Sequence, residues 1–559
     1  MITTDANQWI EAIQDDSVLG GSNMKKFLKG FIVVIILAII GFLYYYVTLP
    51  AINIHSPGFW WFILVALIIV TIIATMISFV GKKKELQGRK TVGRMLTIAI
   101  AIATGVLLVI FVVGSILSSP IVNARKYQRM LTIQDRNFTD DIKEISYKEI
   151  PILDKDSAIL LGSRKMGSIA EYVSQFEVSN NYTQINYQGV PVRVTPLRYG
   201  NAFKWLTNRS KGIPAYIKID MATQNVELVK LTKGIKYSES EHFGRNIYRY
   251  LRFNYPTYVF DSINFEIDDS GTPYWICPVK DFTIGLFGGQ TIGRAVIVNA
   301  ITGELADYAL DEVPTWVDKV FSADLLVSLY NYYGTLRHGY WNSVFGQKDA
   351  LQTTEGHNYI AMEDDVWVYT GVTSVGADES NVGFVLMNQR TSETRYYSIS
   401  GAEEYSAMAS AEGQVQHLGY TATFPLLLNI GGEPTFFIAL KDAAGLVKKY
   451  AMVNIAQYQV VAIGDTVNDC EKTYLELMKS SGISVADTTK LPKATGIITK
   501  ISDCVIDGNT HYLILLNNSD QIFDVEVSEY INIIKYDVGD TITFSYTTGA
   551  AFNTVLGIE

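Results

Sequence analysis

The 559-residue chain has little cysteine and no recognisable catalytic motif. Its three cysteines, Cys277, Cys470 and Cys504, have neither the number nor the spacing of a disulfide framework or a metal site, although one disulfide could form. His-Glu-x-x-His, Gly-x-Ser-x-Gly and phosphate-binding glycine loops are all missing from the sequence. We therefore predict no catalytic residue, no cofactor and no metal, and expect that the chain is not an enzyme.

Residues that could bind a metal are scattered along the chain. Two acidic clusters, Glu363-Asp364-Asp365 and Glu266-Ile-Asp268-Asp269, lack the spaced oxygen ligands of a calcium loop, so we expect both to be solvated turns. The histidines are isolated from one another: His55, His242, His338, His357, His417 and His511.

Charged residues are absent from three long apolar stretches, Phe31–Leu49, Phe59–Val80 and Met95–Leu117. Each is about long enough to cross a bilayer as a helix. The sequence therefore predicts a cytoplasmic tail over residues 1–23. It also predicts that residues 24–118 form three transmembrane helices that anchor the chain in membrane lipid.

Basic residues indicate the orientation of this anchor. The loop from Pro50 to Gly58 has none, whereas they cluster before the first stretch and between the second and third: Lys25, Lys26, Lys29, Lys82, Lys83, Lys84, Arg89, Lys90 and Arg94. The positive-inside rule then predicts a multi-pass protein of the cell membrane, with a cytoplasmic N-terminus and an extracellular region after Ser118. A cleaved signal peptide is the alternative for the first stretch, but Tyr44-Tyr45-Tyr46 stands where small residues would be needed.

The predicted extracellular region is acidic. Residues 1–130 hold 12 basic and 5 acidic residues, and the remainder holds 34 basic and 51 acidic residues. Such a surface repels nucleic acid and phosphate-rich wall polymers. The scarcity of cysteine in an exported protein of this size fits a Gram-positive bacterial cell envelope.

Two stretches of this region are nearly the same. Gly271-Thr-Pro-Tyr-Trp-Ile-Cys-Pro-Val-Lys-Asp281 reappears as Gly432-Glu-Pro-Thr-Phe-Phe-Ile-Ala-Leu-Lys-Asp442. This similarity indicates an internal duplication. We expect a stalk and lead-in over residues 119–182, a first copy over 183–345 and a second copy over 346–480.

A shorter pattern occurs twice in each copy. An apolar run ends in Asp or Asn, and Thr or Gln follows three residues later, beginning at Asp220, Asn299, Asn388 and Asn454. Asp and Asn side chains cap tight turns, so the pattern predicts four hairpin units rather than ligand sites.

The second of these units resembles a known module. Val296–Leu310, with its Asn-x-x-Thr-Gly-Glu turn, and the expected helix Thr315–Tyr333 are similar to the PepSY type of secreted bacterial domain. In the other units Gln224, Ser392 or Tyr458 replaces the glycine. The resemblance implies a helix on a small antiparallel sheet, in a binding, inhibitory or sensing module sometimes directed towards peptidases. The whole layout also resembles an uncharacterised Gram-positive family of three-span membrane proteins, sometimes labelled CvpA-like or cell-shape-related.

Short strands separated by turn residues follow a linker over residues 481–495. They predict a small β-barrel of the oligonucleotide-binding or SH3-like type over residues 496–559. Two lysines, Lys500 and Lys535, stand against nine acids there, so we expect no nucleic-acid partner.

Together these patterns predict an α+β fold, with a three-helix anchor, duplicated PepSY-like sheet-and-helix units and a C-terminal barrel. The favoured function is non-catalytic binding, scaffolding or regulation in the envelope. The partner would be an envelope protein or wall component, with Trp341, Trp367 and Tyr369 as candidate contacts if they are exposed, although each is expected first as a core residue. One alternative is an envelope enzyme with its site at the seam of the two copies. Another is a subunit of a larger membrane complex, packed through small residues: Gly41, Ala66, Ala74, Gly105 and Gly114.

Overall fold

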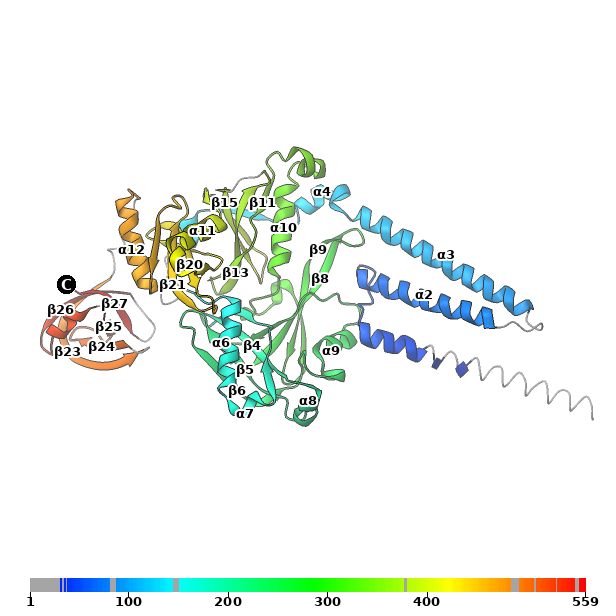
Figure 1. Cartoon of the computed structure of the whole chain (residues 1–559), viewed down its shortest axis with the longest axis horizontal. Helices are drawn as coiled ribbons and strands as arrows, with labels where there is room; N and C mark the ends of the chain where they lie inside the picture. The colour runs from blue at the N-terminus through cyan, green and yellow to red at the C-terminus, as the bar shows by residue number, and fades with distance from the viewer. Residues whose placement is uncertain are drawn as a thin grey trace, which may run out of the picture. The chain divides into compact units, whose positions relative to one another are not determined.

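The protein combines helices with several mainly antiparallel sheets (Figure 1). The structure, a computed structural model, describes residues 31–32, 35–36, 38–80, 87–143, 150–376, 380–483, 492–506, 509–528, 530–547 and 552–558. Contacts divide the chain into a larger unit, Met1–Asn429 with Pro434–Tyr474, and a smaller one, Leu475–Glu559 with Ile430–Glu433. The predicted tail 1–23 and the basic residues from Lys25 to Lys29 and from Lys82 to Lys84 lie outside the described residues.

The predicted fold class is wrong in its membrane part. Among the described residues, helix α3 (Gln87–Leu117) alone is long and apolar enough to cross a membrane, over its segment Thr97–Leu117. The other two apolar helical segments, Ala38–Thr48 and Pro57–Ile72, are shorter. The structure thus offers one candidate span instead of three transmembrane helices.

The start of the second predicted span is partly covered by the protein, which hydropathy alone does not reveal. In α2 (Pro57–Val80), Trp60 and Leu64 are buried within the protein. The Trp60 ring meets Phe287 edge-on at 6.0 Å between centroids, and its Nε1 donates a hydrogen bond to the carbonyl of Ile54. The start of this apolar stretch therefore packs on a sheet of the larger unit.

Polar contacts fix the apolar helices to that sheet. The Ser118 hydroxyl, directly after α3, accepts hydrogen bonds from the backbone N–H groups of Leu286 (2.7 Å) and Phe287 (3.1 Å). Arg252 donates to the carbonyl of Leu49 at 3.0 Å. These contacts join the helical region directly to the folded region.

Four sheets, each preceded by a helix, form most of the larger unit (Figure 1). The preceding helices are α6 (Lys155–Gly167), α9 (Ile247–Asn254), α10 (Ala323–Thr335) and α11 (Glu404–Gln414). Sheet I has the order β2-β4-β5-β6, with β3 paired to β4: β2 (Phe176–Val178), β3 (Thr183–Tyr187), β4 (Val190–Tyr199), β5 (Ile213–Asp220) and β6 (Val226–Ile235). Sheet II has the order β10-β9-β8-β7: β7 (Asn264–Ile267), β8 (Pro273–Ile284), β9 (Gly288–Asn299) and β10 (Leu305–Ala309).

Sheets III and IV repeat this arrangement. Sheet III has the order β1-β16-β15-β13-β11, with β12 paired to β13: β1 (Ile133–Arg136), β11 (Leu351–Thr353), β12 (Asn358–Met362), β13 (Asp365–Ser374), β15 (Gly383–Asn388) and β16 (Thr394–Tyr397). Sheet IV has the order β18-β20-β21-β22, with β19 paired to β20: β18 (Thr421–Ala422), β19 (Leu426–Ile430), β20 (Glu433–Lys441), β21 (Val447–Asn454) and β22 (Val461–Gly464). The remaining elements of the larger unit are α4 (Pro120–Gln128), α5 (Phe138–Asp141), α7 (Ala170–Val173), α8 (Ala202–Asn208), β14 (Ser380–Asn381), β17 (Gly401–Ala402) and the start of α12 (Val467–Ser480).

The predicted hairpin turns are confirmed. Each repeated Asp or Asn ends β5, β9, β15 or β21, and its side chain accepts backbone hydrogen bonds within the following turn. The residue after the repeated Thr has a positive φ in three of the units, at Gln224, Gly303 and Ser392. The similar stretches beginning at Gly271 and Gly432 also occupy equivalent places, in the turns that lead into β8 and β20. Descent from one ancestral unit stays a prediction.

Sheet II is buried on both faces, because successive side chains of a strand point to opposite sides. Trp275 and Val296 belong to the core shared with sheet I. Ile276 and Ile297 belong to the core shared with α10 and sheet III. On the other face of sheet III, Phe384 packs edge-on against Phe436 of sheet IV.

Two connecting segments differ from their predicted form. The predicted stalk contributes β1, which pairs in parallel with β16 of sheet III. The predicted helix Thr315–Tyr333 begins only at Ala323, as α10. The N–H groups of Asp318 and Lys319 bond to the carboxylate of Glu266 instead of forming a helix.

The smaller unit contains the last five strands. In the order β23-β24-β25-β27-β26 they form a closed barrel: β23 (Lys493–Ile506), β24 (Asn509–Leu516), β25 (Ile522–Glu526), β26 (Thr541–Thr547) and β27 (Asn553–Ile558). Phe523 and Phe544 lie fully buried inside it, 5.3 Å apart. His511 is buried, and its Nδ1 lies 2.7 Å from a carboxylate oxygen of Asp524.

Candidate functional site

A cavity of about 240 Å³ lies where the segment entering α6 and sheet I face β12 and sheet IV. It is lined by Pro151, Ile152, Leu153, Asp154, Lys155, Asp156, Arg193, Met221, His357, Asn358, Tyr359, Thr423, Phe424, Leu426, Phe437 and Ala439. These residues come from both predicted copies and from the lead-in. The cavity therefore occupies the seam where the sequence analysis placed an alternative enzyme site.

Arg193 is the buried cation of this cavity. It lies in the middle of β4 and is 5% exposed. Its guanidinium donates to the carbonyl of Leu153 at 3.3 Å and to the side-chain oxygen of Gln184 at 3.2 Å, and both acceptors are neutral. Burial lowers the pKa of Arg193, because water no longer solvates the charge.

The carboxylate nearest the helix start is already committed to other partners. Asp154 caps α6 by accepting from the N–H of Ser157 at 3.0 Å, and it forms an ion pair with Lys441 of β20. Burial favours its neutral form, but the hydrogen bonds from Lys441 and Ser157 prevail and lower the pKa of Asp154. A carboxylate held ionised in this way is poorly suited to donate a proton.

His357 and Tyr359 complete the polar wall of the cavity. The His357 Nε2 lies 3.3 Å from the Tyr359 hydroxyl. Burial lowers the pKa of His357, so the imidazole is neutral at pH 7. The rest of the wall is mainly apolar, from Met221, Phe424, Leu426 and Phe437.

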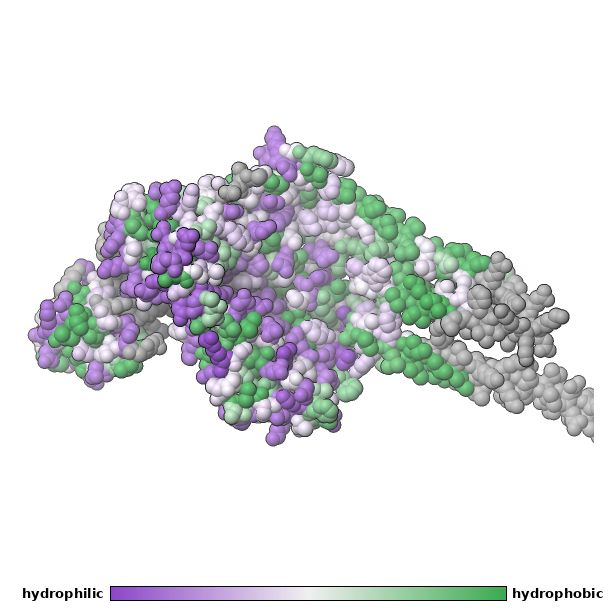
Figure 2. Space-filling view, in the orientation of Figure 1, coloured by the Kyte–Doolittle hydropathy of each residue, from purple (hydrophilic) through white to green (hydrophobic). Residues whose placement is uncertain are grey.

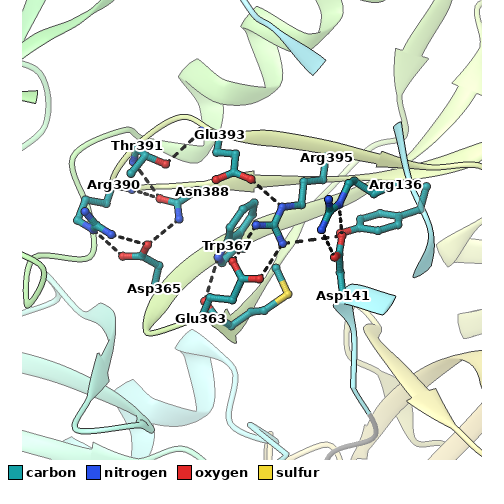
Figure 3. A network of polar contacts seen from close by, with 12 residues as sticks. Arg136, Asp141, Glu363, Asp365, Trp367, Asn388, Arg390, Thr391, Glu393 and Arg395 are labelled. Atoms are coloured by element: carbon teal, nitrogen blue, oxygen red, sulfur yellow. Dashed lines mark hydrogen bonds and ion pairs between the residues drawn. The ribbon is translucent and has the colours of Figure 1, made fainter. Parts of the chain in front are cut away.

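A second polar constellation lies on sheet III. Figure 3 shows Arg395 between Glu363 and Glu393, with Asp141 on its other side. Arg395 forms ion pairs with Glu363 (2.7 Å), Glu393 (2.8 Å) and Asp141 (3.8 Å), and its guanidinium lies 4.5 Å from the centroid of Trp367. Although burial opposes it, these carboxylates raise the pKa of Arg395.

The same network holds the predicted hairpin turn of the third unit. Arg390, which follows Asn388 in the turn, donates to both oxygens of Asp365 at 2.6 and 2.8 Å. Asn388 donates to Asp365 at 2.8 Å (Figure 3). Every charge of this network that lies inside the protein is therefore matched, which indicates a structural role.

The two acidic clusters are only partly solvated. Glu363 and Asp364 form the turn between β12 and β13 with positive φ values of 54° and 64°, as expected for a turn. Asp365 is wrongly predicted as solvated, because it is 5% exposed and paired with Arg390. Glu266 is likewise buried and not solvated. Among the described residues, no group of three or more His, Cys, Asp or Glu could hold a metal ion.

Glu266 and Asp318 form a buried acidic pair. The Glu266 carboxylate accepts from the N–H groups of Asp318 (2.9 Å) and Lys319 (3.0 Å). The Asp318 carboxylate accepts from the N–H of Asn186 at 2.8 Å. Burial raises the pKa of Glu266 to about 7, and burial together with Glu266 raises the pKa of Asp318.

The three predicted contact residues do not come together. Trp367 and Tyr369 are buried in β13, whereas Trp341 is 65% exposed and stacks on exposed Phe345. The cysteines are all free, with Cys277 and Cys470 buried. Burial raises the pKa of both thiols, so neither is a ready nucleophile.

Comparisons with known proteins leave the family open. No family model matches the chain, and no curated protein has significant similarity to it. The PepSY resemblance therefore stays a prediction.

Sequence reasoning missed Arg193 altogether. The available signal was a single arginine inside Val190-Pro-Val-Arg-Val-Thr-Pro196, a run otherwise without charge. His357 was considered only as an isolated histidine, because its neighbours in the cavity come from distant parts of the sequence.

Proposed function

We propose that the chain is a membrane-anchored, non-catalytic binding protein of a bacterial cell envelope. Its α3 helix would hold it in the membrane, and the region after Ser118 would bind a ligand on the outer side. The observation that carries the binding role is the seam cavity with its buried Arg193, whose guanidinium bonds to two neutral oxygens and forms no ion pair with any residue that the structure describes.

The exposure of α3 supports the anchoring role. Thr97–Leu117 is 21 residues long with a mean hydropathy of 2.8, and none of its most apolar window is buried within the protein. Figure 2 shows hydrophobic residues covering α3 where it leaves the folded region. Exposing this much apolar surface to water is unfavourable, whereas lipid would cover it.

Aromatic residues near the end of α3 fit a membrane interface. Tyr127 and Tyr340 pack in one cluster with Ile284, close to Ser118. Trp341 follows Tyr340 and, with Trp61 of α2, exposes more than half of its surface. Tryptophan is enriched at the level of lipid headgroups.

The charge distribution supports the orientation. Arg89, Lys90 and Arg94 precede the apolar segment of α3, which favours a cytoplasmic start and an extracellular end. The acidic surface that follows disfavours nucleic acid as a partner.

Membrane fractionation of cells that express the full chain tests this proposal. The chain should remain in the membrane pellet after alkaline carbonate extraction, and an impermeant amine reagent should label it on intact cells. Val109→Arg places a charge in the middle of the apolar helix and should weaken retention, since such a charge costs about 2.5–3.5 kcal/mol at the centre of a span. Val505→Arg, at an exposed position of the barrel, is the matched control. A chain found in the soluble fraction, or labelled only after lysis, would contradict the proposal.

A further inference from the structure

The seam cavity is lined by charges of both signs, with Asp154 and Asp156 beside Arg193 and Lys155. Arg193, Lys155 and neutral His357 line it, and Lys319 lies near enough to interact with Arg193 and Lys155. Burial, together with the repulsion from Lys155 and Arg193, lowers the pKa of Lys319 despite the attraction of Glu266. The positive charges of Arg193 and Lys155 therefore disfavour the charged form of Lys319.

Neither Arg193 nor Lys319 forms an ion pair within the part of the chain that the structure describes. Arg395 differs from both, because three carboxylates surround its guanidinium. Asp154 is engaged by Lys441, and the neighbouring Asp156 is exposed to solvent. A buried charge without a partner costs free energy unless a ligand supplies the opposite charge.

The shape and the wall composition restrict the ligand. A cavity needs a volume of about 10–15 Å³ to hold one water molecule. The seam cavity, at about 240 Å³, therefore admits a small organic molecule. Phe424, Leu426 and Phe437 offer an apolar wall opposite the cationic groups. The planar guanidinium of Arg193 matches the two oxygens of a carboxylate or the oxygens of a phosphate.

We infer that the seam cavity binds a small organic oxyanion, a carboxylate or a phosphate monoester that carries an apolar group, through Arg193. The oxyanion lies against the Arg193 guanidinium, and the apolar group lies against Phe424, Leu426 and Phe437. This inference rests on the proposed binding function but not on membrane anchoring.

Ligand-observed NMR titrations of the full chain in detergent, at constant ionic strength, test the inference. The probes are 3-phenylpropionate, phenyl phosphate, inorganic phosphate, and the peptide Ala-Ala-Phe with a free or an amidated C-terminus. Arg193→Gln removes the charge but keeps a hydrogen-bond donor, whereas Arg198→Gln removes an exposed arginine of the same strand, paired with Glu177, as the control. All variants share the same detergent, so partitioning into micelles cancels in the comparison.

We expect saturable binding of at least one aromatic oxyanion. Arg193→Gln should weaken it by about tenfold or more, because the charge-assisted hydrogen bond is lost, and Arg198→Gln should leave it unchanged. Binding of the free-acid peptide but not of the amide would show that the oxyanion is the C-terminal carboxylate of a peptide. Binding of phenylpropionate or phenyl phosphate alone would identify a free small molecule.

Two results would overturn the inference: no saturable binding of any probe, or equal affinities in the wild type and Arg193→Gln. If Arg193→Gln does not fold, Arg193→Lys provides the test, because it keeps the charge but loses the planar pair of donors that matches two oxygens. Unchanged affinity in that variant would equally refute the inference. Fractionation reports on the anchor separately, so failure of one proposal is distinguishable from failure of the other.

Discussion

Removing the charge of Arg395 should clearly lower the stability of the folded region. Its side chain is 7% exposed and bonds to Glu363 and Glu393, with Asp141 at 3.8 Å. Arg395→Met keeps most of the apolar stem and its packing on Trp367 but removes the charge. The variant thus isolates the electrostatic contribution of one buried cation.

The expected loss of stability depends on the hydrogen-bond partners that each carboxylate keeps once the Arg395 guanidinium is gone. Asp141 is buried but keeps Arg136 (2.6 Å) and the Tyr397 hydroxyl (2.8 Å), so it is not left alone. Glu363 is half exposed and can regain water. We therefore expect a cost of about 2–3 kcal/mol, at or below the lower end of the range for breaking a fully buried pair.

Thermal unfolding of the purified full chain is the assay, with Arg198→Met as the control. Arg198 pairs with Glu177 on the surface, where both side chains are about half exposed, so its loss should cost less than about 1 kcal/mol. The unfolding entropy, about 2.1 cal/mol/K per residue, adds up over the several hundred residues of this unit, so a loss of about 2–3 kcal/mol lowers the unfolding midpoint by roughly 2–4 °C. Equal midpoints for the two variants would refute the reasoning that matched buried charges stabilise sheet III.

Three further predictions concern the turn, the seam and the buried acids. Asn299→Ala should destabilise by about 1–2 kcal/mol in chemical unfolding, because two backbone N–H groups lose their acceptor, whereas Asn299→Asp should be tolerated, as Asp220 is in the first unit. Arg193→Met should cost less than Arg395→Met in the same thermal assay, because it deprives no carboxylate of a partner; a larger cost would show that Arg193 is structural. The contribution of Glu266 to stability should be fully present below about pH 4.5 and should fall by up to about 3 kcal/mol as the pH rises to about 7. The reason is that the folded carboxyl keeps a proton that the unfolded one releases. Asp318→Asn should flatten that decline in unfolding midpoints measured against pH, and an unchanged slope would contradict the assignment to this pair.

Local turn chemistry could be predicted from the sequence because its determinants are neighbours in the chain. The side chain of Asn299 reaches N–H groups two and three residues ahead, and Asp220 and Asn388 do the same. The spacing alone therefore predicted four hairpins.

Features that depend on distant partners could not be predicted. Nothing near Trp60 in the sequence indicates that Phe287 contacts its ring. The first half of the expected helix before Ala323 has helical periodicity, but its N–H groups bond to Glu266. Likewise, the sequence shows Arg193 but not that its guanidinium bonds to the neutral oxygens of Leu153 and Gln184.

Anomalous diffraction from crystals of the full chain soaked in sodium selenate tests the seam cavity most directly. Selenate carries the charge and the oxygens of the inferred ligand, and its selenium can be located without reference to the protein atoms. We predict a selenium peak within hydrogen-bonding reach of the Arg193 guanidinium that disappears in Arg193→Gln. An empty cavity at saturating selenate, or a peak that persists in the variant, would contradict an oxyanion site at the seam.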